Sequence, residues 1–282
     1  MILVTGGYGQ LGTELRLLLD ERKIPYLATD SNELDITDKE AVEKFLTKHK
    51  PNFIMHCAAY TAVDKAEDEG KEACFQVNVE GTQNIAKAAS KIGATVIYIS
   101  TDYVFDGKFV GELSEEHSVN PISVYGETKY KGEQAIRDNL DNFYIVRTSW
   151  VFGKYGHNFV YTMLKLAEQC DKLSIVNDQT GRPTWTRTLA EFLLHLYRNT
   201  PEYGVYHLSN DGACTWYDFA CEILKDKDLQ IEPVTSEQFI QKASRPKYSV
   251  MSLEKAKSTD FFIPTWQEAL KRMKEELGEN EF

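Results

Sequence analysis

The feature that most constrains the fold is a glycine-rich turn close to the start of the chain. Three glycines, at positions 6, 9 and 12, occur in the run Thr5-Gly6-Gly7-Tyr8-Gly9-Gln10-Leu11-Gly12. Ile2 to Val4 predict a strand before this run, and leucines at 11, 15, 18 and 19 predict an amphipathic helix after it. A G-x-x-G-x-x-G turn between a strand and a helix is typical of dinucleotide-binding folds, in which N–H groups at the helix start receive a pyrophosphate.

The first half of the chain alternates short apolar strands with helical patterns. Further strands are expected at 26–29, 53–57, 95–100 and 143–147, with a long helix over 77–91. This alternation predicts an α/β fold with a Rossmann-type doubly wound parallel sheet and a ligand at the carboxyl ends of its strands. We expect a dinucleotide-binding Rossmann domain over 1–150 and a smaller α/β substrate domain over 151–282. Whether 186–208 returns to the first domain stays open.

Composition narrows the class of protein. The net charge of −11 argues against nonspecific binding to nucleic acid or to anionic membranes. Five cysteines, an odd number without a C-x-x-C pair, predict reduced thiols and a cytoplasmic location. The first residues predict a strand rather than a signal peptide. No apolar run approaches the ~18 residues of a membrane span, and the six histidines lack the spacing of a metal site.

Acidic residues follow the second expected strand. Asp30 comes 24 positions after Gly6, where a carboxylate accepts hydrogen bonds from the adenosine ribose and repels a 2′-phosphate. It therefore favours NADH over NADPH, unless it is only a solvated residue at the strand end. Asp35 and Ile36 stand where a second loop can pack on adenine.

A tyrosine and a lysine four residues apart carry the candidate chemistry. Tyr125 and Lys129 would share one face of a helix, where the ammonium is expected to lower the pKa of the phenol. Thr101 stands at the carboxyl end of an expected strand, where its hydroxyl is placed to donate to a reacting oxygen. A Tyr-x-x-x-Lys pair alone is common. Together with the threonine and the glycine turn it indicates proton transfer to a carbonyl beside a nicotinamide.

These motifs together resemble the extended short-chain dehydrogenase/reductase family. Four longer strings, at 61–67, 100–107, 147–151 and 177–184, narrow the resemblance to the members that reduce dTDP-linked 4-keto sugars. It runs from Met1 to about Leu224. The resemblance implies NAD(P)H-dependent reduction of the 4-keto group of dTDP-4-dehydrorhamnose to dTDP-L-rhamnose, the last step of dTDP-rhamnose synthesis.

The resemblance also assigns residues to roles. Catalysis would use Thr101, Tyr125 and Lys129. The residues implied to bind NADPH or NADH are Gly6, Tyr8, Gly9, Gln10, Leu11, Gly12, Asp30, Asp35, Ile36, Ala58, Ala59, Tyr60, Thr61, Tyr125 and Lys129. Those implied to bind the dTDP-sugar are Val63, Thr101, Asp102, Tyr103, Trp150 and Arg182. Arg182 would hold the diphosphate, a role that suits the fork of a guanidinium. The alternatives are a surface charge in a turn for Arg182 and a core residue for Trp150. No metal is expected.

Other functions on the same fold stay open. A dehydratase of this family would need Thr-Asp-Glu, whereas Tyr103 follows Asp102 here. Another nucleotide-sugar reductase, an epimerase that retains its cofactor, and a non-catalytic regulatory subunit are the remaining alternatives. The sequence leaves open the nucleotide base, the sugar stereochemistry and the choice between a monomer and a homodimer.

Overall fold

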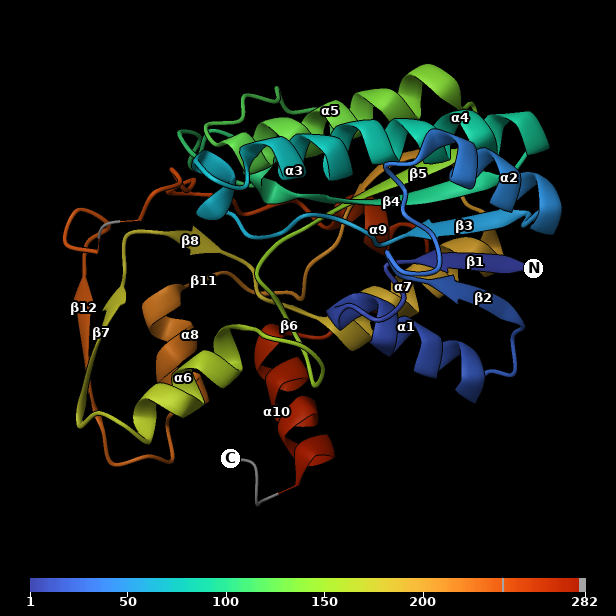
Figure 1. The fold of residues 1–282 in the computed structure, drawn as a ribbon. Helices are drawn as coiled ribbons and strands as arrows, with labels where there is room; N and C mark the ends of the chain where they lie inside the picture. The colour runs from blue at the N-terminus through green and yellow to red at the C-terminus, as the bar shows by residue number, and fades with distance from the viewer. Residues whose placement is uncertain (240, 279–282) are drawn as a thin grey trace.

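Six parallel strands form the central sheet (Figure 1). The computed structural model describes residues 1–239 and 241–278. The strands are ordered β10-β5-β4-β3-β1-β2, and each neighbouring pair is parallel. Their bounds are β1 Ile2–Thr5, β2 Tyr26–Thr29, β3 Phe53–His56, β4 Thr95–Thr101, β5 Phe143–Thr148 and β10 Gly204–His207. The α/β fold with a Rossmann-type doubly wound parallel sheet, predicted from the sequence, is confirmed.

The five strands expected from the sequence each begin at the predicted residue and end within one residue of the prediction. The reason is that β1, β3, β4 and β5 are apolar almost throughout and are buried, as expected for parallel strands covered on both faces.

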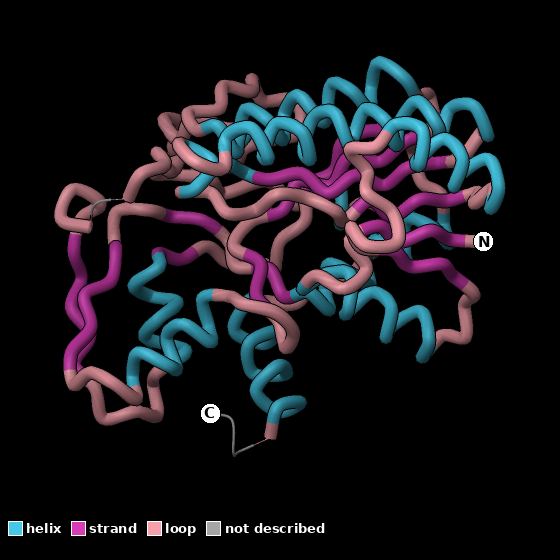
Figure 2. The backbone as a smooth tube through the Cα atoms, viewed as in Figure 1, coloured by secondary structure: helices cyan, strands magenta, loops and turns pink. Residues whose placement is uncertain are grey.

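Helices cover both faces of the sheet, as Figures 1 and 2 show. On one face lie α2 Lys39–His49, α4 Thr82–Ile92 and α5 Val124–Asn139. On the other lie α1 Gln10–Glu21 and α7 Thr186–Asn199, which pack against each other. Asp38 caps α2, because its side chain accepts hydrogen bonds from the N–H groups of Glu40 and Ala41.

The helix expected over 77–91 is interrupted near its start. The chain instead forms α3 Lys71–Phe75, the π-helical turn η2 Gln76–Gly81, and then α4. Within the wide turn, the buried Asn78 amide accepts a hydrogen bond from Tyr60 N (2.8 Å) and donates to Tyr60 O (3.1 Å). This pair of bonds fixes the chain that follows β3 against the helix.

The remaining elements form a smaller group beside the carboxyl edge of the sheet (Figure 1). Its core is apolar and includes the buried aromatic residues Phe152, Trp185, Phe219 and Trp266. Its elements are β6 Val151–Phe152, α6 Phe159–Ala167, β7 Lys172–Val176, β8 Thr180–Gly181, β9 Thr184–Trp185, β11 Cys214–Thr215, α8 Trp216–Ile223, β12 Gln230–Val234 and α10 Trp266–Leu277. Short helical turns elsewhere are η1 Lys65–Glu67, η3 Asp102–Val104 and α9 Glu254–Lys257.

The sequence left open whether the segment 186–208 returns to the first domain. In the structure this segment joins the central sheet and the helices that cover it. Its helix α7 packs on α1, and its strand β10 pairs with β5 at the sheet edge. The division of the chain at residue 150 stays a prediction. Within the described residues, no helix combines the length and the apolar character needed to span a bilayer.

Candidate functional site

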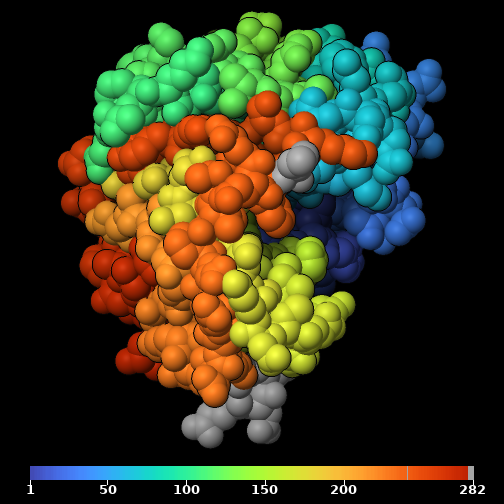
Figure 3. All heavy atoms as spheres, turned by 90° about the vertical axis from the view of Figure 1, so that its left-hand side faces the viewer, coloured from blue at the N-terminus to red at the C-terminus, as the bar shows by residue number. Residues whose placement is uncertain are grey.

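A cavity of about 440 Å³ opens at the carboxyl edge of the sheet. Figure 3 looks onto this edge and shows a hollow with N-terminal residues, in blue, at its back. The cavity is lined by Gly6, Gly9, Gln10, Leu11, Gly12, Cys57, Ala59, Thr61, Val63, Ile99, Ser100, Thr101, Asp102, Tyr103, Tyr125, Lys129, Thr148, Ser149, Trp150, Val151, His157 and Leu189. It therefore brings together all three predicted catalytic residues with most of the predicted cofactor and substrate contacts.

The glycine turn forms one wall of this cavity. Gly6 has a φ of +64°, and a Cβ at this position would lie 2.6 Å from the backbone N of Ala58. A Cβ on Gly12 would collide with Gly6 O. Only glycine therefore allows β1, β3 and α1 to approach so closely.

The start of α1 suits an anionic group. The helix begins at Gln10, and no side chain among the described residues caps its first turn at Gly9. Its free N–H groups, at the positive end of the helix dipole, lie in the cavity wall. Gln10 Oε1 is buried without a partner among the described atoms, so it is also available to a ligand. The residues at this turn fit a dinucleotide pyrophosphate.

Several predicted cofactor residues lie beyond the cavity wall. Tyr8 is exposed, with the Arg16 guanidinium 4.2 Å from its ring centroid. Asp30 follows β2, and its Oδ1 accepts a hydrogen bond from Asn32 N (2.7 Å), which is the main cause of its lowered pKa. The other predicted residues outside the wall are Asp35, Ile36, Ala58 and Tyr60. Asp35 accepts a hydrogen bond from Thr37 N, and Ile36 is buried. Tyr60 N donates to Asn78. Their predicted roles stay predictions.

The hydroxyl of Thr101 is engaged within the protein. It donates to Asp102 Oδ1 (3.1 Å) and accepts from Tyr103 N (3.2 Å). Asp102 is 2% exposed, and burial raises the pKa of its carboxyl to about 6 while bonds from Ser249 and Thr101 lower it. Tyr125 packs edge-on against Tyr103, with ring centroids 5.5 Å apart. The expected donation from Thr101 to a substrate oxygen would require this hydroxyl to turn away from Asp102.

The expected effect of Lys129 on the tyrosine is not found. Burial raises the pKa of Tyr125, the Asp102 carboxylate adds to the rise, and Lys129 is not among the causes. Instead, burial lowers the pKa of Lys129 to about 7. Its Nζ lies 4.1 Å from the ring centroid of Tyr98. The sequence reasoning missed this outcome because it counted the charge of the ammonium but not the cost of burying it.

Trp150 lies in the cavity wall in a strained conformation. Its φ of +49° is unusual for an aromatic residue. The ring stacks on Trp216 with centroids 3.7 Å apart, and a Cβ on Gly181 would lie 2.8 Å from it. Strained backbone persists only where surrounding contacts hold it. Trp150 is thus held as a flat wall of the cavity.

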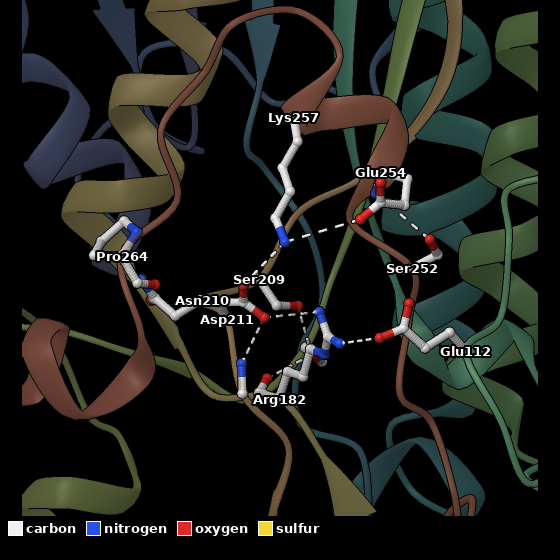
Figure 4. A network of polar contacts seen from close by, with 11 residues as sticks. Glu112, Arg182, Ser209, Asn210, Asp211, Ser252, Glu254, Lys257 and Pro264 are labelled. Atoms are coloured by element: carbon white, nitrogen blue, oxygen red, sulfur yellow. Dashed lines mark hydrogen bonds and ion pairs between the residues drawn. The ribbon is translucent and has the colours of Figure 1, made fainter.

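Arg182 is not among the residues that line the cavity, and Figure 4 shows the polar contacts that it makes instead. Its side chain is 6% exposed and pairs with Glu112 (2.6 Å) and Asp211 (3.6 Å). Both carboxylates offset its charge, and Lys257 binds Asp211 in turn (2.9 Å). The resemblance and the fork of its guanidinium predicted that this residue holds the diphosphate, and that role stays a prediction. The structure shows the guanidinium buried and ion-paired.

Some residues at the site have no signal in the sequence. Ser149, His157 and Leu189 line the cavity, and Ser249 contacts Asp102. Ser149 lies within the string 147–151 but was given no role there, whereas His157, Leu189 and Ser249 come from segments without a recognisable motif and are brought to the site only by the fold. Behind the site, Glu133 accepts hydrogen bonds from Ser100 (2.6 Å) and from two nitrogens of the buried Arg147. No cluster of three potential metal ligands occurs among the residues that the structure describes.

Comparison with known proteins identifies the family. The model of the RmlD substrate binding domain family matches residues 1–279. The chain belongs to this family. The dTDP-4-dehydrorhamnose reductase of Aggregatibacter actinomycetemcomitans is 39% identical to the chain, over 97% of the chain and 98% of that protein. The resemblance seen in the motifs is thereby confirmed.

Solved structures of relatives agree over the whole fold. A dTDP-4-dehydrorhamnose reductase from Clostridium acetobutylicum is 42% identical, with a TM-score of 0.95 over 98% of this chain and 99% of that one. A dTDP-4-dehydrorhamnose reductase from Bacillus anthracis, solved in complex with NADP, is 38% identical. It has a TM-score of 0.93 over 96% of this chain and 97% of that one.

Proposed function

We propose that the protein catalyses the NAD(P)H-dependent reduction of dTDP-4-dehydrorhamnose to dTDP-L-rhamnose, the last step of dTDP-rhamnose synthesis, in the cytoplasm. The observation that carries the proposal is the meeting of Thr101, Tyr125 and Lys129 with the glycine turn in one cavity. The two solved relatives and the curated one carry the same reductase name.

When bound, the nicotinamide cofactor supplies the hydride that reduces the ketone carbon. The N–H groups at the start of α1 bind its pyrophosphate, and Gln10 Oε1 is free to accept a further bond. Lys129 anchors the cofactor from the facing helix α5. These contacts orient the cofactor, and the walls formed by Val63 and Trp150 hold the sugar nucleotide.

Tyr125 donates the proton that the reduced ketone oxygen requires. The phenol is protonated at neutral pH, as its ordinary pKa near 10 already requires, and this is the state that a proton donor needs. Lys129 is close to half charged at neutral pH because its pKa is about 7. In its ammonium form it would hold the cofactor in the cavity that it shares with Tyr125, and Thr101 keeps the hydroxyl network beside the phenol in place.

The test is to replace Tyr125 by phenylalanine, which removes one hydroxyl and little packing. NADPH consumption is followed with dTDP-4-keto-6-deoxyglucose, with and without the 3,5-epimerase that converts it to the L-sugar. We expect turnover by the wild type only when the epimerase is present. We expect the variant to lose about 10²- to 10⁴-fold in kcat, as is typical for the loss of a general acid.

The matched control is Tyr130→Phe, which removes a hydroxyl from the same helix outside the cavity wall. It should retain turnover, and both variants should bind NADPH with the wild-type Kd. A Tyr125→Phe enzyme that keeps more than about a tenth of the wild-type rate would place the acid elsewhere. Reduction without the epimerase would assign the chain to another sugar stereochemistry.

A further inference from the structure

A buried carboxylate in the cavity wall depends on a hydroxyl from far along the chain. Asp102 begins the turn η3 directly after β4 and is 2% exposed. Its Oδ1 accepts from Thr101 Oγ1 (3.1 Å), and its Oδ2 accepts from Ser249 Oγ (2.6 Å). A buried carboxylate needs such donors to stay ionised, and the serine bond is the shorter of the two.

Ser249 is itself held rigidly. It is 2% exposed, and its N–H donates to Thr180 O (2.9 Å) at β8. Before Ser249 in the chain, Lys247 O accepts a hydrogen bond from Thr180 N (2.8 Å). After it, Val250 O accepts one from Leu113 N (2.9 Å). The serine hydroxyl therefore reaches Asp102 from a backbone fixed on both sides.

We propose that Ser249 is a positioning residue for the reduction. Its hydroxyl fixes the Asp102 carboxylate, which in turn orients the Thr101 hydroxyl beside Tyr125. The inference rests on the proposed function. It adds a residue from the C-terminal part of the chain to the machinery at the end of β4. Without this bond the Asp102 carboxyl is free to rotate, and the Thr101 proton loses its fixed acceptor.

The charge of Asp102 gives the proposal a measurable consequence. Burial raises the pKa of the carboxyl to about 6, and the bond from Ser249 is the largest influence that lowers it. The titratable groups that face it are Tyr103 on η3 and Tyr125 on α5. Burial raises the pKa of both phenols, so both stay neutral through the acid range. The Arg245 guanidinium, beside Tyr103, keeps its charge throughout.

The experiment measures kcat/KM against pH for the wild type, Ser249→Ala and Ser249→Thr. A hydrogen bond to a charged group is worth about one to two pKa units. We therefore expect Ser249→Ala to move the acid limb upward by about one to two pH units and to lower kcat/KM about two- to tenfold at neutral pH. Ser249→Thr keeps the hydroxyl and should restore the wild-type limb. Ser252→Ala, on the same stretch, is the matched control, because its hydroxyl bonds to Glu254 N instead.

An acid limb that stays at its wild-type pH in Ser249→Ala would overturn the proposal. A loss of activity that leaves the acid limb unshifted, and that Ser249→Thr does not rescue, would also overturn it. That pattern is expected of a purely structural residue. A second readout needs no substrate. The infrared carboxyl band that disappears in Asp102→Asn should titrate at higher pH in Ser249→Ala. If the wild type does not consume NADPH with the L-sugar, the proposed function fails, whereas an unshifted carboxyl band refutes the Ser249 bond alone.

Discussion

Replacing Lys129 by methionine is expected to stabilise the ligand-free protein while removing its activity. Lys129 is 2% exposed. Burial lowers its pKa from 10.5 to about 7, although the Glu133 carboxylate, one helical turn away, raises it in part. In the unfolded chain the amine keeps a pKa of about 10.4. Folding at neutral pH therefore either removes a proton or buries a charge, and both processes cost free energy.

The magnitude follows from the two pKa values. Each unit of difference corresponds to about 1.4 kcal/mol, so the buried amine destabilises the folded chain by up to about 5 kcal/mol below pH 7. The contact between Nζ and the Tyr98 ring, 4.1 Å from its centroid, offsets up to about 2 kcal/mol of this. Methionine keeps a similar length without the charge. We expect a net gain of about 3 kcal/mol at pH 7.

The gain should depend on pH in a defined direction. The folded pKa lies below the unfolded one, so the penalty is fully present below pH 7. It shrinks as the pH rises through the interval up to about 10.5, above which both states are neutral. Urea unfolding of the wild type and Lys129→Met, compared from about pH 6 to about pH 10, isolates this residue from other titrating groups.

Lys131→Met is the matched control for the stability measurement. Lys131 lies on the same helix, is exposed, and pairs with Glu127 (2.7 Å) at the surface. Such a pair contributes less than about 1 kcal/mol, so this variant should change stability little at any pH. A difference between wild type and Lys129→Met that is the same at about pH 6 and about pH 10 would refute the reasoning. A methionine variant less stable than the wild type at pH 7 would also refute it.

Two further substitutions test the predicted contacts outside the cavity wall. Asp30→Ala should increase the affinity for NADPH relative to NADH, because it removes a carboxylate that would repel the 2′-phosphate. An unchanged ratio of the two Kd values, measured by fluorescence titration, would show that Asp30 does not face the ribose. Arg182→Ala should lower the free energy of unfolding by about 2 kcal/mol, because it breaks the pairs with Glu112 and Asp211, and should leave the KM for the dTDP-sugar within about threefold. A KM increase of about tenfold or more at unchanged stability would support its predicted role at the diphosphate.

Most of the site could be predicted because its parts lie in local motifs at one sheet edge. The turn containing Gly6 and Gly12 requires glycine for reasons of backbone geometry alone. Thr101 ends a strand that the apolar pattern locates to within a residue. The carboxyl ends of parallel strands meet at the same edge, so these motifs converge once the strand order is known. Tyr125 and Lys129 join them because their helix, α5, packs next to β4.

The remainder depends on packing between distant segments, which a single sequence does not encode locally. Ser249 contacts a residue 147 positions earlier, and the burial of Arg182 depends on Glu112, 70 positions earlier. Trp216 supports Trp150 from helix α8, 66 positions later in the chain. The protonation states of the site could not be predicted from the sequence for a related reason. They follow from burial, which periodicity indicates for apolar residues but not for a lysine.

Two of the cavity groups whose pKa values are shifted, Asp102 and Lys129, act on the same proton balance from opposite sides. Burial raises the pKa of Asp102 to about 6 and lowers that of Lys129 to about 7, so the ligand-free site has both charges together only in a narrow range near neutrality. An anion bound at the start of α1, in the wall of the same cavity, favours the charged form of Lys129 and raises its pKa. Binding of the dinucleotide therefore widens the pH range in which Tyr125 has an ammonium beside it. The free energy that the empty site loses by burying this amine is recovered when its charge meets the ligand.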